Sequence, residues 1–199
     1  IGEQNMMSVA SGLASEGFNV FTTTFSPFQT FRCAEQIKVN LGYMKNKVVM
    51  VGLASGLVLG NLGFTHCSIE DIGVLRSIPN LTIISPSDSL ETAKAVEASM
   101  NYHESVYIRL TGGSNNPIVN SIDYKFEIGK ARILKEGKDI LIISNGMMVK
   151  KSLEISDELQ KKGMDVSILN MHTIKPLDTN TLDKIMKKYK YCFCIEEHN

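Results

Sequence analysis

Short apolar runs alternate with amphipathic segments along the first half of the chain. The pattern predicts helices over residues 4–16, 29–41, 69–77 and 87–100, and strands over 20–24, 47–53, 81–85 and 105–110. The run KVVMVGL at 47–53 is apolar throughout, which is typical of a strand covered on both faces. Asp88 and Glu91 have the spacing of a capping box, so we expect the fourth helix to begin there.

A change of composition separates this first unit from a second. Residues 111–123 (TGGSNNPIVNSID) gather Gly, Asn, Ser and Pro without periodicity, which is typical of a linker. Beyond it we expect strands at 131–134, 139–144, 166–169 and 191–195, and helices at 147–162 and 179–189. This alternation predicts an α/β protein of two three-layer units with mainly parallel sheets. We expect a first domain at 1–112, a linker at 113–126 and a second domain at 127–199.

Composition narrows the class of partner. Lys and Arg number 21 and so do Asp and Glu, a balance that argues against nucleic acid or an anionic membrane as the main partner. No apolar run approaches the roughly 20 residues of a membrane span, and no signal peptide opens the sequence. Because the chain begins at Ile1 without Met and stops just after a strand-like run, we interpret it as a fragment.

The cysteines bear on the cellular compartment. Cys33, Cys67, Cys192 and Cys194 lie on unrelated segments, and the one close pair is a Cys-x-Cys within an apolar run. This spacing favours buried free thiols over disulfides or a zinc site. We therefore expect a reducing compartment, the cytoplasm.

Three segments carry candidate chemistry, because open parallel sheets bind ligands at the carboxyl ends of their strands. Glu3 stands where a strand should end and a helix begin, and it either has a functional role or stabilises the helix dipole. Phe25, Phe28 and Phe31, spaced by three around a proline, form either a stacking wall for a flat ring or a helix packing face. His66 ends a loop with three glycines and is a proton donor, a substrate ligand or a structural side chain.

The other histidines have weaker cases. We expect His103 to be solvated and His172 to pack within a turn, while His198 gives no basis for an assignment. The sequence contains neither a Ser/His/Asp spacing nor a metal-ligand cluster, so we predict no metal site on this chain.

Four motifs occur in an order that resembles a known family. GEQNMMSVASGLASEG (2–17), FSPFQTFRCAEQI (25–37), GFTHCSIEDIGVLRSIPNLTIISPSD (63–88) and VYIRL (106–110) resemble the pyrimidine-binding domain of transketolases. That family depends on thiamine diphosphate and includes deoxyxylulose-phosphate synthases. FEIGKARIL (126–134), the helix near Met147 and residues 169–178 resemble its C-terminal domain. The chain is most similar to the separately encoded C-terminal half of a split transketolase, without the start of the first domain and the end of the second.

The resemblance implies roles in cofactor binding. Glu3 matches the catalytic glutamate that hydrogen-bonds N1′ of the aminopyrimidine and so activates the coenzyme. Phe25, Phe28 and Phe31 match the aromatic wall around that ring, with Phe28 as the stacking residue. Ile1 matches the bulky residue that helps to hold the cofactor bent.

The resemblance also implies substrate contacts, with two departures. His66 matches a catalytic histidine that contacts substrate hydroxyls or the carbonyl, and Arg32 and Arg109 are further substrate-binding candidates. Transketolases generally carry an acidic stretch before the Thr-His pair, where this chain has Asn61 and Leu62. A phosphate-binding arginine usually follows the VYIRL-type strand, where this chain has Gly112. We therefore expect a non-standard ketose donor, for example a nucleotide-linked sugar, in transfer of a ketol unit to an aldehyde acceptor.

The family motif that binds the metal and the diphosphate, Gly-Asp-Gly…Asn, does not occur in this sequence. The resemblance implies that an N-terminal-half partner subunit holds Mg²⁺ (or Ca²⁺) and the diphosphate, in an α2β2 assembly. Two alternatives stay open. One is the β-type subunit of a 2-oxo-acid dehydrogenase, and the other is a non-catalytic cofactor-binding scaffold subunit.

Overall fold

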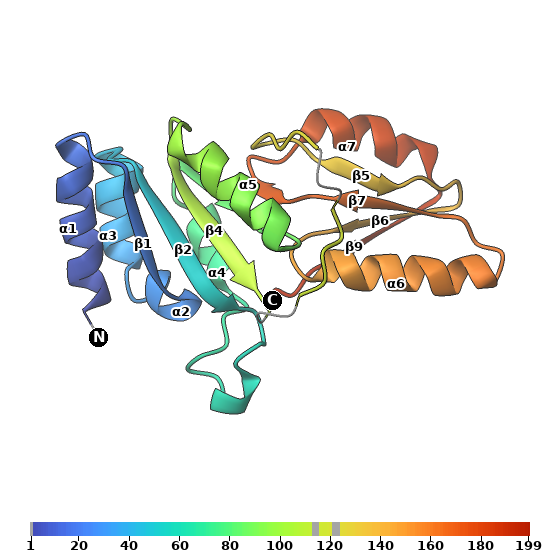
Figure 1. The fold of residues 1–199 in the computed structure, drawn as a ribbon, viewed down its shortest axis with the longest axis horizontal. Helices are drawn as coiled ribbons and strands as arrows, with labels where there is room; N and C mark the ends of the chain where they lie inside the picture. Colours follow the sequence, from blue (N-terminus) through green and yellow to red (C-terminus); the bar gives the residue numbers. More distant parts are fainter. Residues whose placement is uncertain (1, 113–115, 121–123) are drawn as a thin grey trace.

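Two α/β units lie side by side in the computed structural model, which describes residues 2–112, 116–120 and 124–199 (Figure 1). The elements of the first unit are α1 (Glu3–Ser15), β1 (Val20–Phe25), α2 (Ser26–Gln29), α3 (Ala34–Gln36), the π-helix η1 (Ile37–Tyr43), β2 (Val48–Ser55), the 3₁₀ turn η2 (Gly60–Leu62), α4 (Asp71–Arg76), β3 (Leu81–Ile84), α5 (Ser89–Met100) and β4 (Ser105–Thr111). Those of the second are β5 (Arg132–Lys135), β6 (Ile140–Ser144), α6 (Met148–Lys161), β7 (Val166–Asn170), β8 (Thr173–Lys175), α7 (Thr179–Ile185), the 3₁₀ turn η3 (Met186–Lys188) and β9 (Tyr191–Ile195).

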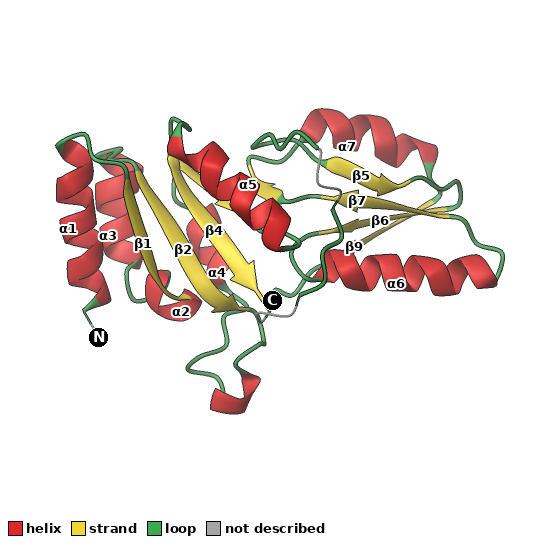
Figure 2. Cartoon of the chain, in the orientation of Figure 1, coloured by secondary structure: helices red, strands yellow, loops and turns green. Residues whose placement is uncertain are grey.

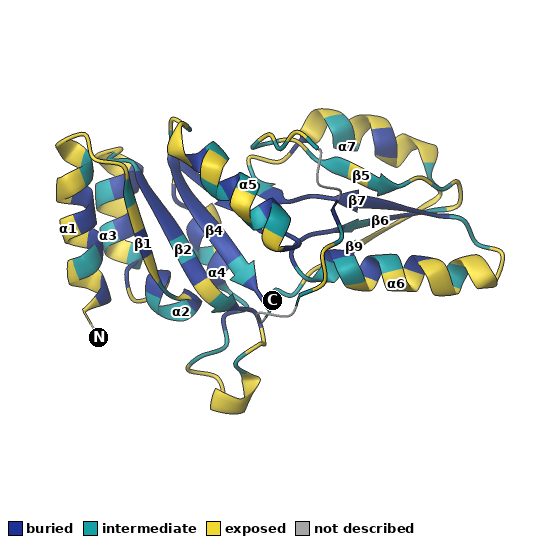
Figure 3. Ribbon diagram, in the orientation of Figure 1, coloured by how far each residue is buried: buried dark blue, intermediate teal, exposed yellow. Residues whose placement is uncertain are grey.

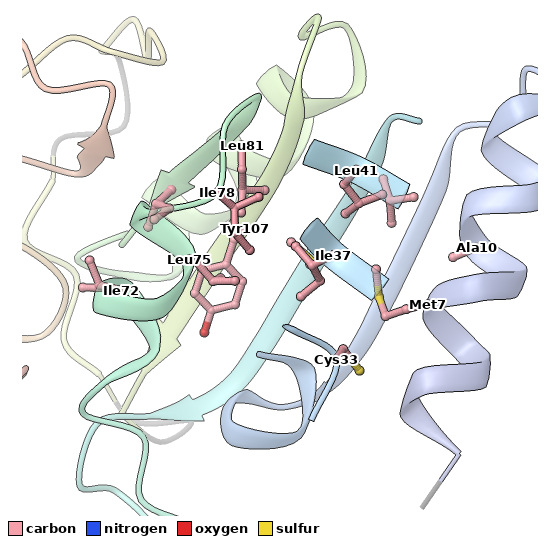
Figure 4. Close-up of a cluster of buried hydrophobic side chains, with 13 residues drawn as sticks. Met7, Ala10, Cys33, Ile37, Leu41, Ile72, Leu75, Ile78, Leu81 and Tyr107 are labelled. Carbon is pink, nitrogen blue, oxygen red and sulfur yellow. The ribbon is translucent and has the colours of Figure 1, made fainter. Parts of the chain in front are cut away.

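The first sheet has the strand order β1-β2-β4-β3-β8, and its first four strands are parallel (Figure 2). Successive residues of β2 point to opposite faces, as strand geometry requires. Val48 and Met50 join a cluster with α1, η1 and α4, which Figure 4 shows in close-up, whereas Val49 packs on the other face with Ala95 of α5. Both faces of β2 are therefore covered, as its continuous apolar run predicts.

The second sheet has the order β5-β7-β6-β9, with β5 antiparallel and the other three strands parallel. Leu141 and Leu169 pack on one face with Ile185 of α7, while Ile142 and Ile168 lie on the other face with Leu153 of α6. The sequence-based prediction of two α/β units with mainly parallel sheets is confirmed.

The helix predicted over 29–41 is wrong in its continuity. The segment forms α2, a tight turn, α3 and then η1, which ends at Tyr43. At the break, the Thr30 hydroxyl donates to the Ser26 carbonyl at 2.8 Å and the Cys33 thiol to the Phe28 carbonyl at 3.3 Å. Such side-chain hydrogen bonds offer the backbone an alternative to the helical ladder.

Strand β8 is absent from the sequence-based prediction. It lies in the expected second domain but pairs antiparallel with β3 of the first sheet. On the same path, the Ser85 amide donates to the His172 carbonyl at 2.7 Å. A three-residue strand has no periodicity of its own, so the sequence pattern does not reveal it. The second unit thus completes the sheet of the first.

All four cysteines are free thiols, as expected, but two of them are exposed rather than buried. Cys33 lies in the core, whereas Cys192 and Cys194 are exposed because β9 is an edge strand of its sheet. Among the described residues, no helix is both long and apolar enough to cross a membrane. Within the expected linker, residues 113–115 and 121–123 lie outside the described residues.

Asp88 caps α5 and ties it to the connection between the two units. Its Oδ1 accepts the Glu91 amide at 2.7 Å, and its Oδ2 accepts the amides of Val119 at 2.8 Å and Asn120 at 2.9 Å. The predicted N-cap is confirmed. The Glu91 carboxylate, however, accepts the amide of Ser87 rather than that of the capping residue.

We expect Asp88→Asn to lower the free energy of unfolding by about 1–2 kcal/mol at pH 7, because a charged acceptor of three amides is lost. Burial alone would raise the pKa of Asp88, but the hydrogen bonds from Glu91, Asn120 and Val119 outweigh it and lower the pKa below 3.8. The stabilisation is therefore present above pH 3.8 and is lost as the pH falls through the lower folded pKa.

Urea unfolding between pH 2 and 7 measures this effect, with the exposed Asp183→Asn as the matched control. The gap between wild type and Asp88→Asn should narrow below pH 3.8. A constant gap across the range would contradict the assignment.

Candidate active site

A carboxylate stands at the first residue of α1. Glu3 is only 8% exposed, and its Oε2 accepts Arg32 Nη1 at 2.8 Å. The amino end of a helix favours negative charge. Hydrogen bonds from the chain's amino group and from Arg32 lower the pKa of Glu3 to about 2. The carboxylate is therefore ionised at neutral pH.

Phe28 is the centre of an aromatic cluster beside this carboxylate. The Arg32 guanidinium carbon lies 4.0 Å from the centroid of the Phe28 ring. The His66 ring meets Phe28 edge-on with 5.4 Å between centroids, and the Phe25 centroid lies 6.3 Å from each of them. The structure thus brings together Glu3 and Arg32 with three rings drawn from β1, α2 and a distant loop.

Two buried polar side chains hold the aromatic wall against the rest of the first unit. Pro27 lies at the start of α2, where its missing amide proton leaves no bond unmade. Gln29, which is fully buried, donates to Thr22 Oγ1 and to Met7 Sδ, both at 3.1 Å. Sequence reasoning missed Gln29. The signal available was a polar side chain between Phe28 and Phe31, where it has to find buried partners.

A pocket of about 410 Å³ adjoins the cluster. Phe28, Phe31 and Arg32 line it on the α2 side, and Phe64, Cys67 and Glu70 line it on the loop side. Neither Glu3 nor His66 is among its lining residues. The predicted aromatic wall therefore has two surroundings: Phe25 and Phe28 face His66, while Phe31 faces this neighbouring pocket.

His66 belongs to a protruding loop, residues 56–68, which we call the His66 loop. The Gly56 amide donates to the Ser68 carbonyl at 2.7 Å and the Ser68 amide to the Gly56 carbonyl at 2.9 Å, which closes the base of the loop. Thr65 Oγ1 lies 2.9 Å from His66 Nδ1. Much of the loop is solvent-exposed (Figure 3), with Phe64 at 87% exposure.

Arg109, predicted to contact substrate, lies in the core and does not reach this cluster. It is 1% exposed, and its Nε donates to Asp71 Oδ2 at 2.8 Å. The same carboxylate oxygen accepts the hydroxyls of Tyr107 at 2.8 Å and Ser26 at 3.2 Å. Because its guanidinium is engaged beneath the site, the geometry gives Arg109 a structural role. The burial of this arginine depends on Asp71, a partner that the strand pattern alone does not reveal.

The remaining sequence-predicted residues divide as follows. Ile1 lies outside the described residues. His103 is exposed, and His172 is buried and stacks on Phe126 with 4.4 Å between ring centroids, both as expected. Burial lowers the pKa of His172. Across residues 2–112, 116–120 and 124–199, no three His, Cys, Asp or Glu side chains are grouped as metal ligands.

Arg32→Met should raise the pKa of Glu3 from about 2 towards its ordinary value of 4.5, because one of the two donors that lower it is removed. The Met side chain keeps an apolar stem over Phe28. A pH titration of the Glu3 carboxyl carbon by NMR measures the shift, with Arg76→Met on the exposed face of α4 as control. An unchanged Glu3 pKa would show that Arg32 does not tune this group.

Arg109→Met should lower the free energy of unfolding by about 3–5 kcal/mol, because the fully buried Asp71 carboxylate loses its ionic partner. Urea unfolding measures the loss, and the double variant Arg109→Met/Asp71→Leu should recover part of it. Arg32→Met, which removes an exposed guanidinium, is the matched control and should leave the unfolding free energy nearly unchanged. An Arg109→Met variant as stable as wild type would exclude the role given to this pair.

Two domain families match the chain. Residues 1–116 match the family described as transketolase, pyrimidine binding domain, and residues 129–199 match transketolase, C-terminal domain. The pyrimidine-binding match contains Glu3, the aromatic cluster and the His66 loop.

Individual relatives agree. One of the two subunits named for an apulose-4-phosphate transketolase, from Phocaeicola vulgatus, is 35% identical over all of this chain, which spans 64% of that protein. The 6-deoxy-6-sulfo-D-fructose transketolase subunit SqwH of Clostridium sp. is 37% identical over 89% of this chain and 55% of its own length. A solved structure described as a split gene transketolase, inactive beta4 tetramer, matches with a TM-score of 0.91 at 33% identity, over 100% of this chain and 64% of the other. The chain therefore belongs to the transketolase family, and it contains that family's pyrimidine-binding and C-terminal domains.

Proposed function

We propose that this chain is the C-terminal subunit of a thiamine-diphosphate-dependent transketolase, which transfers a ketol unit from a ketose donor to an aldehyde acceptor. The observation that carries the proposal is the cluster of Glu3, Arg32 and Phe28 at the head of α1. It lies within the segment that matches the pyrimidine-binding domain.

The chemistry of this cluster fits an aminopyrimidine. The guanidinium of Arg32 is flat and cationic, stacks on Phe28 and donates an N–H to Glu3. An aminopyrimidine offers the same features, namely a flat ring for stacking and ring nitrogens that hydrogen-bond to a carboxylate. The ring face of Phe28 and the carboxylate of Glu3 therefore suit such a group.

When bound, thiamine diphosphate supplies the carbon nucleophile and the electron sink that the reaction needs. Glu3 would hydrogen-bond N1′ of the pyrimidine and Phe28 would stack on the ring, while Phe25 shields the site from water. His66, adjacent to Phe28 and held by Thr65, would contact the oxygens of the substrate.

We further propose that an N-terminal-half partner subunit carries the diphosphate and Mg²⁺ (or Ca²⁺), in an α2β2 complex in the cytoplasm. Relatives named as one subunit of a transketolase support a two-chain enzyme, and the inactive beta4 tetramer supports the need for a partner. Free thiols are compatible with a reducing compartment. The relatives' names favour transketolase over a 2-oxo-acid dehydrogenase.

We propose a modified ketose, rather than an ordinary pentose or hexose phosphate, as the donor. Relatives named for apulose-4-phosphate and 6-deoxy-6-sulfo-D-fructose support this class. Position 112 adds a physical argument, because Gly112 has φ +83° and a Cβ there would lie 2.3 Å from Asn116 Nδ2. An arginine at this position is therefore strained and obstructed, which supports a donor that does not depend on a guanidinium there.

The first test is reconstitution. Co-purification with the N-terminal-half partner should give a complex that binds thiamine diphosphate with magnesium, whereas this chain alone should bind it weakly. Calorimetry measures both affinities, and a donor screen with modified, phosphorylated and nucleotide-linked ketoses follows. Tight, magnesium-dependent binding by the isolated chain would contradict the division of labour.

The second test concerns Glu3. In the reconstituted complex, Glu3→Gln should reduce kcat by at least about 100-fold, because a Gln cannot exchange a proton with the pyrimidine. The exposed Glu35→Gln, one turn from Arg32, is the matched control and should retain wild-type turnover. Full turnover in Glu3→Gln would favour the scaffold subunit instead.

A further inference from the structure

The segment that follows β9 lies against the base of the His66 loop. These residues, 196–199, come from the second unit, and we call them the clasp. The side chain of Glu197 accepts the Leu57 amide through Oε1 at 3.2 Å, and the Asn199 amide donates to the Ile69 carbonyl at 2.7 Å. One contact lies at each side of the loop base, so the clasp spans it.

A second pair of contacts anchors the clasp to the first unit. The Gly73 amide at the side of α4 donates to His198 Nε2 at 3.2 Å. Arg109 Nη2 donates to the Glu197 carbonyl at 2.9 Å and to the Ser68 carbonyl at 3.2 Å. One buried guanidinium nitrogen therefore connects the clasp with the closing residue of the loop.

The backbone at Gly56 is matched to Glu197. Gly56 has φ +77°, a conformation that side chains rarely adopt, and a Cβ at this position would lie 2.0 Å from Glu197 Oε2. Glycine is thus required here for two reasons, its left-handed backbone and the carboxylate packed against it. The sequence of the loop base and that of the clasp are fitted to each other.

The His66 loop needs such support because little else orders it. It contains Gly56, Gly60 and Gly63, and Leu57, Leu62 and Phe64 expose at least half of their surfaces. Glycines lose much backbone entropy on ordering, and exposed side chains contribute few contacts to offset that loss. The position of His66 therefore depends on the contacts at the loop base.

We propose that Glu197 is a positioning residue for substrate binding, which fixes the base of the His66 loop so that His66 stays against Phe28. The inference rests on the proposed function and deepens it: the second unit contributes to donor recognition without touching the donor. Glu3, Arg32 and Phe28 form no contact with the clasp among the described interactions, so cofactor binding should not depend on it.

The test compares Glu197→Ala and Glu197→Gln with Glu196→Ala in the complex with the N-terminal-half partner. Glu196 is the exposed neighbour in the same segment, and its carboxylate faces Asn145 of the second unit at 3.5 Å. Glu197→Ala should raise the donor KM about tenfold and lower kcat less, because the misplaced loop weakens substrate orientation. Glu197→Gln keeps an acceptor oxygen and should lie between Glu197→Ala and wild type, and Glu196→Ala should match wild type.

Two further readouts separate positioning from general stability. Hydrogen exchange at residues 57–66 should accelerate in Glu197→Ala, while the affinity for thiamine diphosphate should stay within about twofold of wild type. An unchanged donor KM, or equal effects of Glu196→Ala and Glu197→Ala, would overturn the proposal.

The proposed function and the clasp fail in different ways. A wild-type complex without transketolase activity would contradict the function, whereas unchanged exchange of the loop in Glu197→Ala would by itself refute the clasp. Where Glu197→Ala does not fold, Glu197→Gln compared with Glu196→Gln decides the same question.

Discussion

The buried ion pair of Asp71 and Arg109 is the interaction on which the candidate site depends. Both side chains are excluded from water, so each charge needs the other, and removal of either leaves an uncompensated charge in the core. Through Ser26 the pair holds the start of the aromatic wall, and through the Ser68 carbonyl it holds the end of the His66 loop. The two halves of the site therefore share one electrostatic anchor, which burial alone cannot provide because apolar packing lacks direction.

The same anchor explains why the two units act as one body around the site. Arg109 also binds the Glu197 carbonyl, β8 extends the first sheet, and the Asn170 amide of β7 donates to Glu91 of α5 at 2.9 Å. Each of these contacts joins a group from one unit to a group from the other. The second unit is therefore part of the frame that sets the geometry of the first.

Local patterns predicted much of the fold, and long-range pairings account for what they missed. The apolar run of β2 and the Asp88 cap follow from neighbouring residues, and both are confirmed. Strand β8 and the break at Thr30 depend on partners or carbonyls that no periodic pattern encodes. For the site, the resemblance predicted Glu3, Phe28 and His66, which do come together, although their roles stay predictions. Arg109 and Glu197 depend on partners that are distant in the sequence, such as Asp71, 38 positions before Arg109.

The stacking of Arg32 on Phe28 has a consequence for recognition. A tethered side chain has a high effective concentration at the surface it covers, so any flat cation that arrives there competes with a neighbour that never leaves. Exchange of one such cation for the other changes the local free energy little. The net affinity of a coenzyme would then arise mainly from its distant end, so that selection among flat nitrogenous rings is delegated to whatever grips the far side of the molecule.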